Sequence, residues 1–170
     1  FKRCDVDEID KIIYMSQGQL LPSFHGLELG MSEKLLIRAI ALASGQEAQA
    51  VEKRYKELGD LGKTADAILH GDGKGLDVNN VYSVIFETAK MGGEGSVEKK
   101  ITSIGDLLSD VTPVEAKYIA RFVAGRLRLG VGDATVLEAL SLAKFGRGYK
   151  DQLERAYNLC SDLGLVGRIL

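Results

Sequence analysis

The stretch LELGMSEKLLIRAIALA, residues 27–43, recurs 100 positions later as LRLGVGDATVLEALSLA, residues 127–143. The likeness resumes after a slip of two residues, where the triplet Asp60-Leu61-Gly62 corresponds to Asp162-Leu163-Gly164. This spacing is too long for a solenoid, whose repeats run to about 20–50 residues. The sequence therefore predicts a duplicated helical unit with pseudo-two-fold symmetry, which suits a nearly two-fold partner such as duplex DNA.

Apolar residues keep helical spacing through nearly the whole chain. Ser32 is expected to cap one helix, which Gly45 ends, and the capping-box pattern Thr112-Pro113-Val114-Glu115 starts another. Asp133 is expected to cap the corresponding helix of the second copy. We predict an all-α fold, a single domain of about 9–11 helices. Its two related halves are placed at about residues 1–75 and 76–170 and share one core.

Composition narrows the classes of protein. The 170 residues are 45% hydrophobic and 27% charged, with a net charge of -2, which is mildly acidic for a nucleic-acid binder. No apolar run is long enough to span a membrane, so no membrane partner is expected. Cys4 and Cys160 lack metal-site spacing, and no catalytic triad is visible, so neither catalytic nor metal-binding residues are predicted. Because the chain begins at Phe1 without methionine, we expect it to be a fragment.

The most specific element is GRLRLG, residues 125–130. In an extended segment alternate side chains share a face, so Arg126 and Arg128 are expected to point one way while Leu127 and Leu129 anchor the loop. Guanidinium groups match phosphate oxygens, and the flanking Gly125 and Gly130 let the backbone approach a partner. No Asp or Glu occurs between Lys117 and Arg128, which favours unpaired arginines. These features predict a phosphate-binding loop.

Two further groups have the chemistry to hold phosphate on backbone amides at a helix start. They are Gly95 with Ser96, Lys99 and Lys100, and Gly30 with Ser32. Simpler interpretations stay open for both basic elements. The arginines of the loop suit surface ion pairs, worth about 0–1 kcal/mol each. Ser96 suits a plain helix N-cap followed by solvated lysines.

Five motifs in this order resemble one family. They are residues 26–30, residues 59–62, residues 93–100, Glu115-Ala116-Lys117-Tyr118 and residues 125–130. Together they resemble the N-terminal DNA-binding domain of ATP-dependent DNA ligases, particularly the archaeal and eukaryotic replicative ones. The resemblance implies an all-helical domain that grips the minor groove of nicked duplex DNA, and an intracellular location: the cytoplasm or nucleoid of an archaeon, or the nucleus of a eukaryote.

The resemblance implies that the same residues contact DNA. Arg126 and Arg128, with the backbone around Gly125, Leu127 and Gly130, are expected to meet the DNA backbone. The group at residues 95–100 is then a second contact, and Gly30 with Ser32 a third. These are the positions that the residue chemistry nominates independently.

The family's chemistry is not expected in this chain. Adenylation needs the lysine of a KxDG motif, and no such motif occurs. The adenylation and OB domains are absent, so ATP and magnesium are implied for those parts and no cofactor for this one. The ligase's own catalytic domains are expected partners. A sliding clamp is also a partner of some relatives, but the loop at residues 70–76 lacks the glutamine and aromatics of their clamp motif.

Two other classes of function compete with duplex binding. One is a helical protein-interaction module without DNA affinity, whose loops meet an acidic partner. The other is a stand-alone enzyme, against which the missing nucleophile and nucleotide loop argue. A mobility shift with random duplex DNA separates the first alternative from a duplex binder.

Overall fold

The computed structural model describes residues 1–127, 129–146 and 148–170. Within these ranges the chain is helical, with no strand, which confirms the all-α prediction. There are ten α-helices and one short 3-10 helix in the described residues: α1 (Ile9–Ser16), η1 (Ser23–His25), α2 (Glu33–Ser44), α3 (Ala48–Leu58), α4 (Leu61–Ile68), α5 (Val78–Lys90), α6 (Ser96–Ser109), α7 (Pro113–Val123), α8 (Asp133–Lys144), α9 (Lys150–Cys160) and α10 (Leu163–Ile169).

The repeat recurs in the helices themselves. Helices α2 and α8 have equal length and begin 100 residues apart, at Glu33 and Asp133. Helices α3 and α9 are also equal in length, and the aspartates Asp60 and Asp162 cap α4 and α10 through their side chains. Each copy is thus a run of three helices with matching starts. The two-fold relation between the copies stays a prediction.

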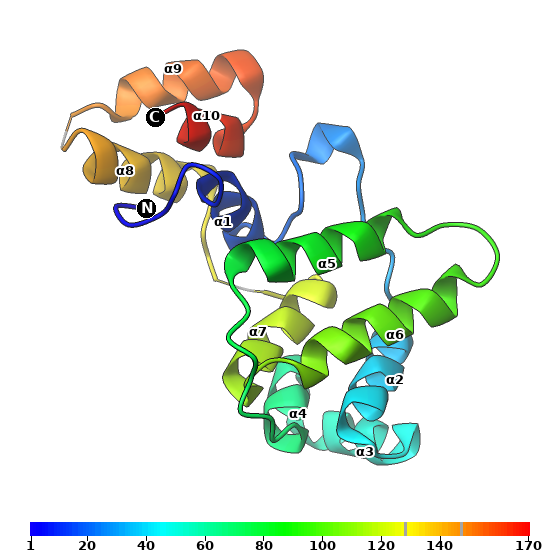
Figure 1. The fold of residues 1–170 in the computed structure, drawn as a ribbon. Helices are drawn as coiled ribbons and strands as arrows, with labels where there is room; N and C mark the ends of the chain where they lie inside the picture. The colour runs from blue at the N-terminus through cyan, green and yellow to red at the C-terminus, as the bar shows by residue number, and fades with distance from the viewer. Residues whose placement is uncertain (128, 147) are drawn as a thin grey trace. The chain divides into compact units, whose positions relative to one another are not determined.

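The packing divides the chain into two compact units. Unit 1 comprises Phe1–Leu27 with Arg128–Leu170, and unit 2 comprises Glu28–Leu127. Unit 2 holds the first copy of the repeat, α2 to α4, with α5 to α7, and unit 1 holds the second copy, α8 to α10, with α1 (Figure 1). Each copy therefore packs with helices outside the repeat: α2 to α4 with α5 to α7, and α8 to α10 with α1. This division differs from the predicted halves at about residues 1–75 and 76–170.

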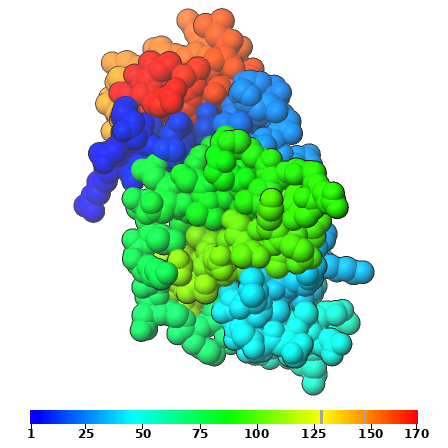
Figure 2. Space-filling model, turned by 45° about the vertical axis from the view of Figure 1, so that its right-hand side comes forward, coloured from blue at the N-terminus to red at the C-terminus, as the bar shows by residue number. Residues whose placement is uncertain are grey.

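Unit 2 is built on two helix pairs, in which α2 lies against α6 and α4 lies against α7. Helix α6 approaches α2 closely at Gly105. A Cβ on this residue would lie 3.2 Å from the carbonyl oxygen of Ala39. Leu36 and Ile40 of α2 and Ile104 and Leu108 of α6 are fully buried. Helix α3 is peripheral, since Val51 is its one buried residue, and Figure 2 shows this cyan segment at the surface.

Unit 1 has its own core, which joins α1 to the second copy of the repeat. Buried side chains from α1, α8, α9 and α10 form it: Ile9, Ile13, Val136, Leu137, Leu140, Leu153, Leu163 and Val166. Helix α1 lies against α10, as in the blue and red elements of Figure 1. The burial of these apolar side chains is the main force that holds unit 1 together.

Local capping chemistry sets two of the three helix starts for which the sequence predicts a cap. Ser32 accepts a hydrogen bond from Leu35 N, and Gly45 ends α2 in the left-handed conformation. Thr112 and Glu115 form the predicted capping box around Pro113. The prediction for Asp133 is wrong, because Gly132 is the N-cap and Asp133 is the first residue of α8. Its carboxylate accepts hydrogen bonds from other side chains instead.

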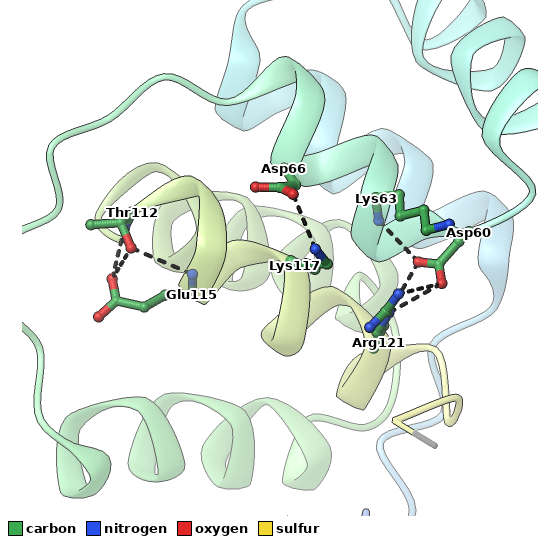
Figure 3. A network of polar contacts seen from close by, with 7 residues as sticks. All are labelled: Asp60, Lys63, Asp66, Thr112, Glu115, Lys117 and Arg121. Carbon is green, nitrogen blue, oxygen red and sulfur yellow. Dashed lines mark hydrogen bonds and ion pairs between the residues drawn. The ribbon is translucent and has the colours of Figure 1, made fainter. Parts of the chain in front are cut away.

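The Asp-Leu-Gly triplet is the most constrained local element of each copy. In unit 2, Asp60 caps α4 by accepting from Lys63 N at 2.9 Å, and also accepts from Arg121 of α7 (Figure 3). In unit 1, Asp162 caps α10 by accepting from Leu165 N and also accepts from the Tyr14 hydroxyl of α1 at 2.7 Å. One aspartate in each copy thus starts a helix and ties it to its neighbour.

The glycine of the triplet lets the neighbouring helix come close. A Cβ on Gly62 would lie 2.5 Å from the Lys117 carbonyl oxygen and 2.7 Å from Arg121 Cγ. A Cβ on Gly164 would overlap the ring of Tyr14. Because a backbone carbonyl cannot move aside like a side-chain tip, the contact at Gly62 excludes any side chain.

Replacement of Gly62 by alanine is expected to lower the free energy of unfolding. The helical preference of alanine is worth about 0.5–1 kcal/mol, but the overlap with α7 costs about 1–3 kcal/mol, so the net change is destabilising. Urea denaturation followed by circular dichroism measures it. Gly92→Ala is the matched control, because open space surrounds Gly92. Equal midpoints for the two variants would contradict the close contact.

The Asp60–Arg121 pair predicts a pH dependence of stability. The hydrogen bond from Arg121 holds the pKa of Asp60 below its usual range, against the opposing effect of burial. A carboxyl with a lowered folded-state pKa stabilises the protein above its unfolded pKa of about 3.9, and this contribution is lost as pH falls through the folded pKa.

Asp60→Asn tests this dependence, because asparagine keeps the helix cap but lacks the charge. We expect the variant to be less stable than wild type by about 1 kcal/mol at pH 7. The difference should shrink as the pH is lowered below about 3.9. Urea midpoints at several pH values measure it, and a difference independent of pH would contradict the ion pair.

Candidate nucleic-acid interface

Two of the three predicted contact groups meet at the start of α2 in unit 2. Gly30 has a left-handed φ of 61°, and Ser32 caps α2 two residues later. The Lys100 Nζ of α6 donates a hydrogen bond to the carbonyl oxygen of Leu29 at 2.7 Å, and lies 3.5 Å from where a Cβ of Gly30 would be. The sequence predicts two separate contacts, but in the folded chain Lys100 of one group lies beside Gly30 of the other.

The basic loop reaches the same helix start through Arg126. Its Nη2 lies 2.8 Å from Oε1 of Glu33, the first residue of α2. The Arg126 side chain remains 53% exposed, so this ion pair does not bury it. The surface ion pair that the sequence leaves open is therefore present, and the guanidinium still faces solvent. Gly125, Arg126 and Leu127 thus belong to unit 2 with the other two groups.

Tyr55 of α3 is the third member of this polar cluster. Burial raises the pKa of Tyr55, and its hydrogen bond to the Glu33 carboxylate raises that pKa further. Arg126 acts in the opposite direction on the same pKa, which places the guanidinium close to the phenol. Glu33, Tyr55 and Arg126 are named here the α2 cluster. Glu33 and Tyr55 are not predicted from the sequence, because neither belongs to a basic or glycine-rich motif.

The second contact group begins α6. Gly95 is the N-cap, with a left-handed φ of 73°, and Ser96 is the first helical residue. The alternative that Ser96 caps the helix is therefore wrong, because Gly95 holds the N-cap position and Ser96 is already helical. Lys99 is exposed and Lys100 is half-buried. Of the two lysines, Lys99 offers its charge to solvent, while Lys100 is committed to the Leu29 carbonyl.

Although no acidic residue lies between Lys117 and Arg128 in the sequence, two cations of the segment before the loop have acidic partners in the fold. Lys117 pairs with Asp66 at 3.3 Å, and Arg121 pairs with Asp60 at 2.9 Å (Figure 3). Their side chains are only 27% and 21% exposed. Both partners come from α4, which is distant in sequence, so no local pattern reveals them.

The remaining predicted residues lie in or beside unit 1. Gly130 has a φ of 66°, close to that of its counterpart Gly30. Leu129 is 49% exposed, so the expectation that it anchors the loop is wrong, whereas Leu127 is half-buried. Arg128 lies outside the described residues, and the predicted alignment of its side chain with Arg126 stays a prediction.

Unit 1 has a polar cluster at the matching helix start. Asp133 accepts a hydrogen bond from the Tyr157 hydroxyl and one from Gln17 Nε2, both at 2.8 Å. The hydrogen bond to Asp133 raises the pKa of Tyr157, and burial raises it further. Asp133, Tyr157 and Gln17 are named here the α8 cluster. An amide stands here where the α2 cluster has a guanidinium.

Metal clusters and membrane-spanning helices are absent from the described residues. No group of three or more His, Cys, Asp or Glu side chains is placed to hold a metal ion there. No helix in these ranges is long and apolar enough to cross a membrane. What the structure does assemble is a pair of donors, Arg126 and Lys100, at the start of α2 beside the left-handed Gly30, chemistry that suits an anion.

The known proteins that this chain resembles are DNA ligases. The family described as "DNA ligase N terminus" matches residues 1–141. A "Probable DNA ligase" of Dictyoglomus turgidum is 45% identical over 99% of the chain, and a "DNA ligase" of Pyrobaculum neutrophilum is 46% identical over 98%. A "DNA ligase" of Aeropyrum pernix is 44% identical over the whole chain.

The chain spans 29%, 30% and 31% of the lengths of these three relatives, so it corresponds to under a third of each. The family match, in contrast, takes in most of the chain, including the first copy of the repeat and all three predicted contact groups. The chain therefore belongs to the DNA ligase N-terminus family.

Proposed function

We propose that this chain is the duplex-binding part of an ATP-dependent DNA ligase and that it binds nicked duplex DNA through backbone phosphates. The observation that carries the proposal is that Arg126 and Lys100, from two of the predicted groups, both reach the start of α2, where Arg126 is half-exposed and Lys100 lies beside Gly30. Donors to phosphate position a protein on the duplex without reading its bases. Binding is therefore independent of sequence and responsive to the shape of the minor groove.

The contact residues of this proposal are those nominated from the sequence. In unit 2 they are Gly30, Ser32, Gly95, Ser96, Lys99, Lys100, Gly125, Arg126 and Leu127. Gly130 and Arg128 complete the set, and Arg128 enters from the sequence alone. The donors are few and the net charge is -2, so we expect the chain alone to bind no tighter than about micromolar at physiological salt.

The chemistry of ligation belongs, in this proposal, to other parts of the ligase. No KxDG motif occurs in the 170 residues, so the chain alone is proposed to be inactive in adenylation. ATP and magnesium serve the catalytic domains, which are its partners in closing around DNA. The loop at residues 70–76 lacks glutamine and aromatics, so the proposal assigns it no role in clamp binding. The proposed location is intracellular, where the DNA substrate lies.

The salt dependence of DNA binding tests the proposal. Binding of the 170-residue chain to a nicked duplex is measured over a range of salt concentrations. Replacement of both Arg126 and Arg128 by alanine removes two phosphate contacts, so the log–log salt slope should flatten by about 2. Wild-type affinity and slope in this variant would contradict the proposal, and no shift of random duplex by the wild type would favour a protein-interaction module.

A charge-matched control separates local contact from overall charge. Arg54 and Lys56 are exposed cations of α3, each paired with a glutamate of the same helix. Arg54→Ala/Lys56→Ala removes the same charge away from the predicted contacts. We expect this variant to keep the wild-type slope. A slope reduced equally in both variants would show that net charge alone governs binding.

A further inference from the structure

The ion pair in the α2 cluster has an unusual geometry. Glu33 Oε1 is buried, and it accepts no hydrogen bond from the described residues, although Arg126 Nη2 lies only 2.8 Å away. The two groups therefore attract each other without an N–H group aligned on that oxygen. Arginine has five N–H donors in a planar fork, so the contact holds the position of the guanidinium while leaving donors to serve another acceptor.

Burial of Oε1 decides how a phosphate can approach. A phosphate oxygen cannot take the place of a buried carboxylate oxygen without opening the cluster, and it can reach the exposed side of Arg126 directly. Glu33 is therefore a support for Arg126 and not a competitor that DNA displaces. Tyr55 of α3 interacts with the same carboxylate, and this interaction raises the pKa of its phenol.

The same construction occurs in the other copy of the repeat. An acidic residue opens α2 and α8, and a tyrosine of the following helix interacts with it in each case. Tyr157 of α9 donates to Asp133 at 2.8 Å, and Tyr55 of α3 interacts with Glu33. The third member differs, because Arg126 stands beside Glu33 whereas Gln17 donates to Asp133. The shared acid–tyrosine pair is thus a scaffold, and the loop residue determines whether the group presented is a cation or a neutral amide.

We propose that Glu33 and Tyr55 are positioning residues that hold Arg126 ready for a backbone phosphate at the start of α2, and that the α8 cluster lacks this role. This inference rests on the proposed function, since it requires Arg126 to contact DNA. The benefit is preorganisation: a long arginine side chain held in one place loses less conformational freedom when the phosphate binds.

A double-mutant cycle between Tyr55 and Arg126 tests the inference. Tyr55→Phe removes one hydroxyl and leaves the surface charge unchanged. We expect Tyr55→Phe to weaken binding to nicked duplex by about threefold when Arg126 is present, and to have no effect in the Arg126→Ala background. Equal losses in both backgrounds, or no loss beside Arg126, would overturn the inference. Thermal melting of each variant checks that the chain stays folded.

Glu33→Gln provides an independent arm that remains informative if Tyr55→Phe destabilises the fold. Positioning predicts weaker binding in this variant. Simple repulsion between the carboxylate and DNA predicts tighter binding, and that result would overturn the inference. Tyr157→Phe is the matched control, because it breaks the equivalent bond in the α8 cluster and should leave the affinity unchanged; an equal loss there would also count against a role specific to Arg126.

The inference and the proposed function fail in different ways. If Arg126→Ala alone leaves affinity and salt slope unchanged, Arg126 does not contact phosphate, and the proposed function falls together with the inference. If Arg126→Ala weakens binding and the effect of Tyr55→Phe is merely additive, the proposed contact stands and the positioning role is excluded.

Discussion

The close contact between α4 and α7 is the constraint on which the rest of unit 2 depends. Gly62 leaves no room for a side chain beneath the Lys117 carbonyl, and Asp60 accepts from Arg121 one turn further along α7. Since α7 ends at Val123, these two interactions also determine where the following loop begins. A close helix contact thereby places Arg126 against the start of α2. Unit 1 uses the same triplet, with Tyr14 of α1 in place of Arg121.

Cations of unit 2 that are close in sequence form ion pairs with aspartates and do not form an open basic patch. Lys117 and Arg121 look like part of a basic patch in the sequence, but each is held against an aspartate of α4. What remains accessible is a small set of donors at the start of α2, of which Arg126 is half-exposed. Such a surface offers directed hydrogen bonds more than a long-range positive potential, which is consistent with a net charge of -2.

The two copies of the repeat share a helix start and differ in the polar group beside it. The acid–tyrosine pair is retained at the start of both α2 and α8, together with the left-handed glycine three residues before the acid. The neighbouring loop supplies a different residue in each case, Arg126 beside Glu33 and Gln17 beside Asp133. A small change in one loop is enough to alter the chemistry, because the scaffold beneath it is conserved between the copies.

The sequence by itself determined the helical class, the repeat and most helix starts. Caps such as Ser32 and the Thr112–Glu115 box are readable because each hydrogen bond joins residues three apart. Asp133 fails as a cap for a physical reason: its carboxylate is taken by two side chains from other elements. Only the tertiary structure decided which charges are accessible. The partners of Arg121 and Arg126 lie far away in sequence, and ion pairing depends on distance in space.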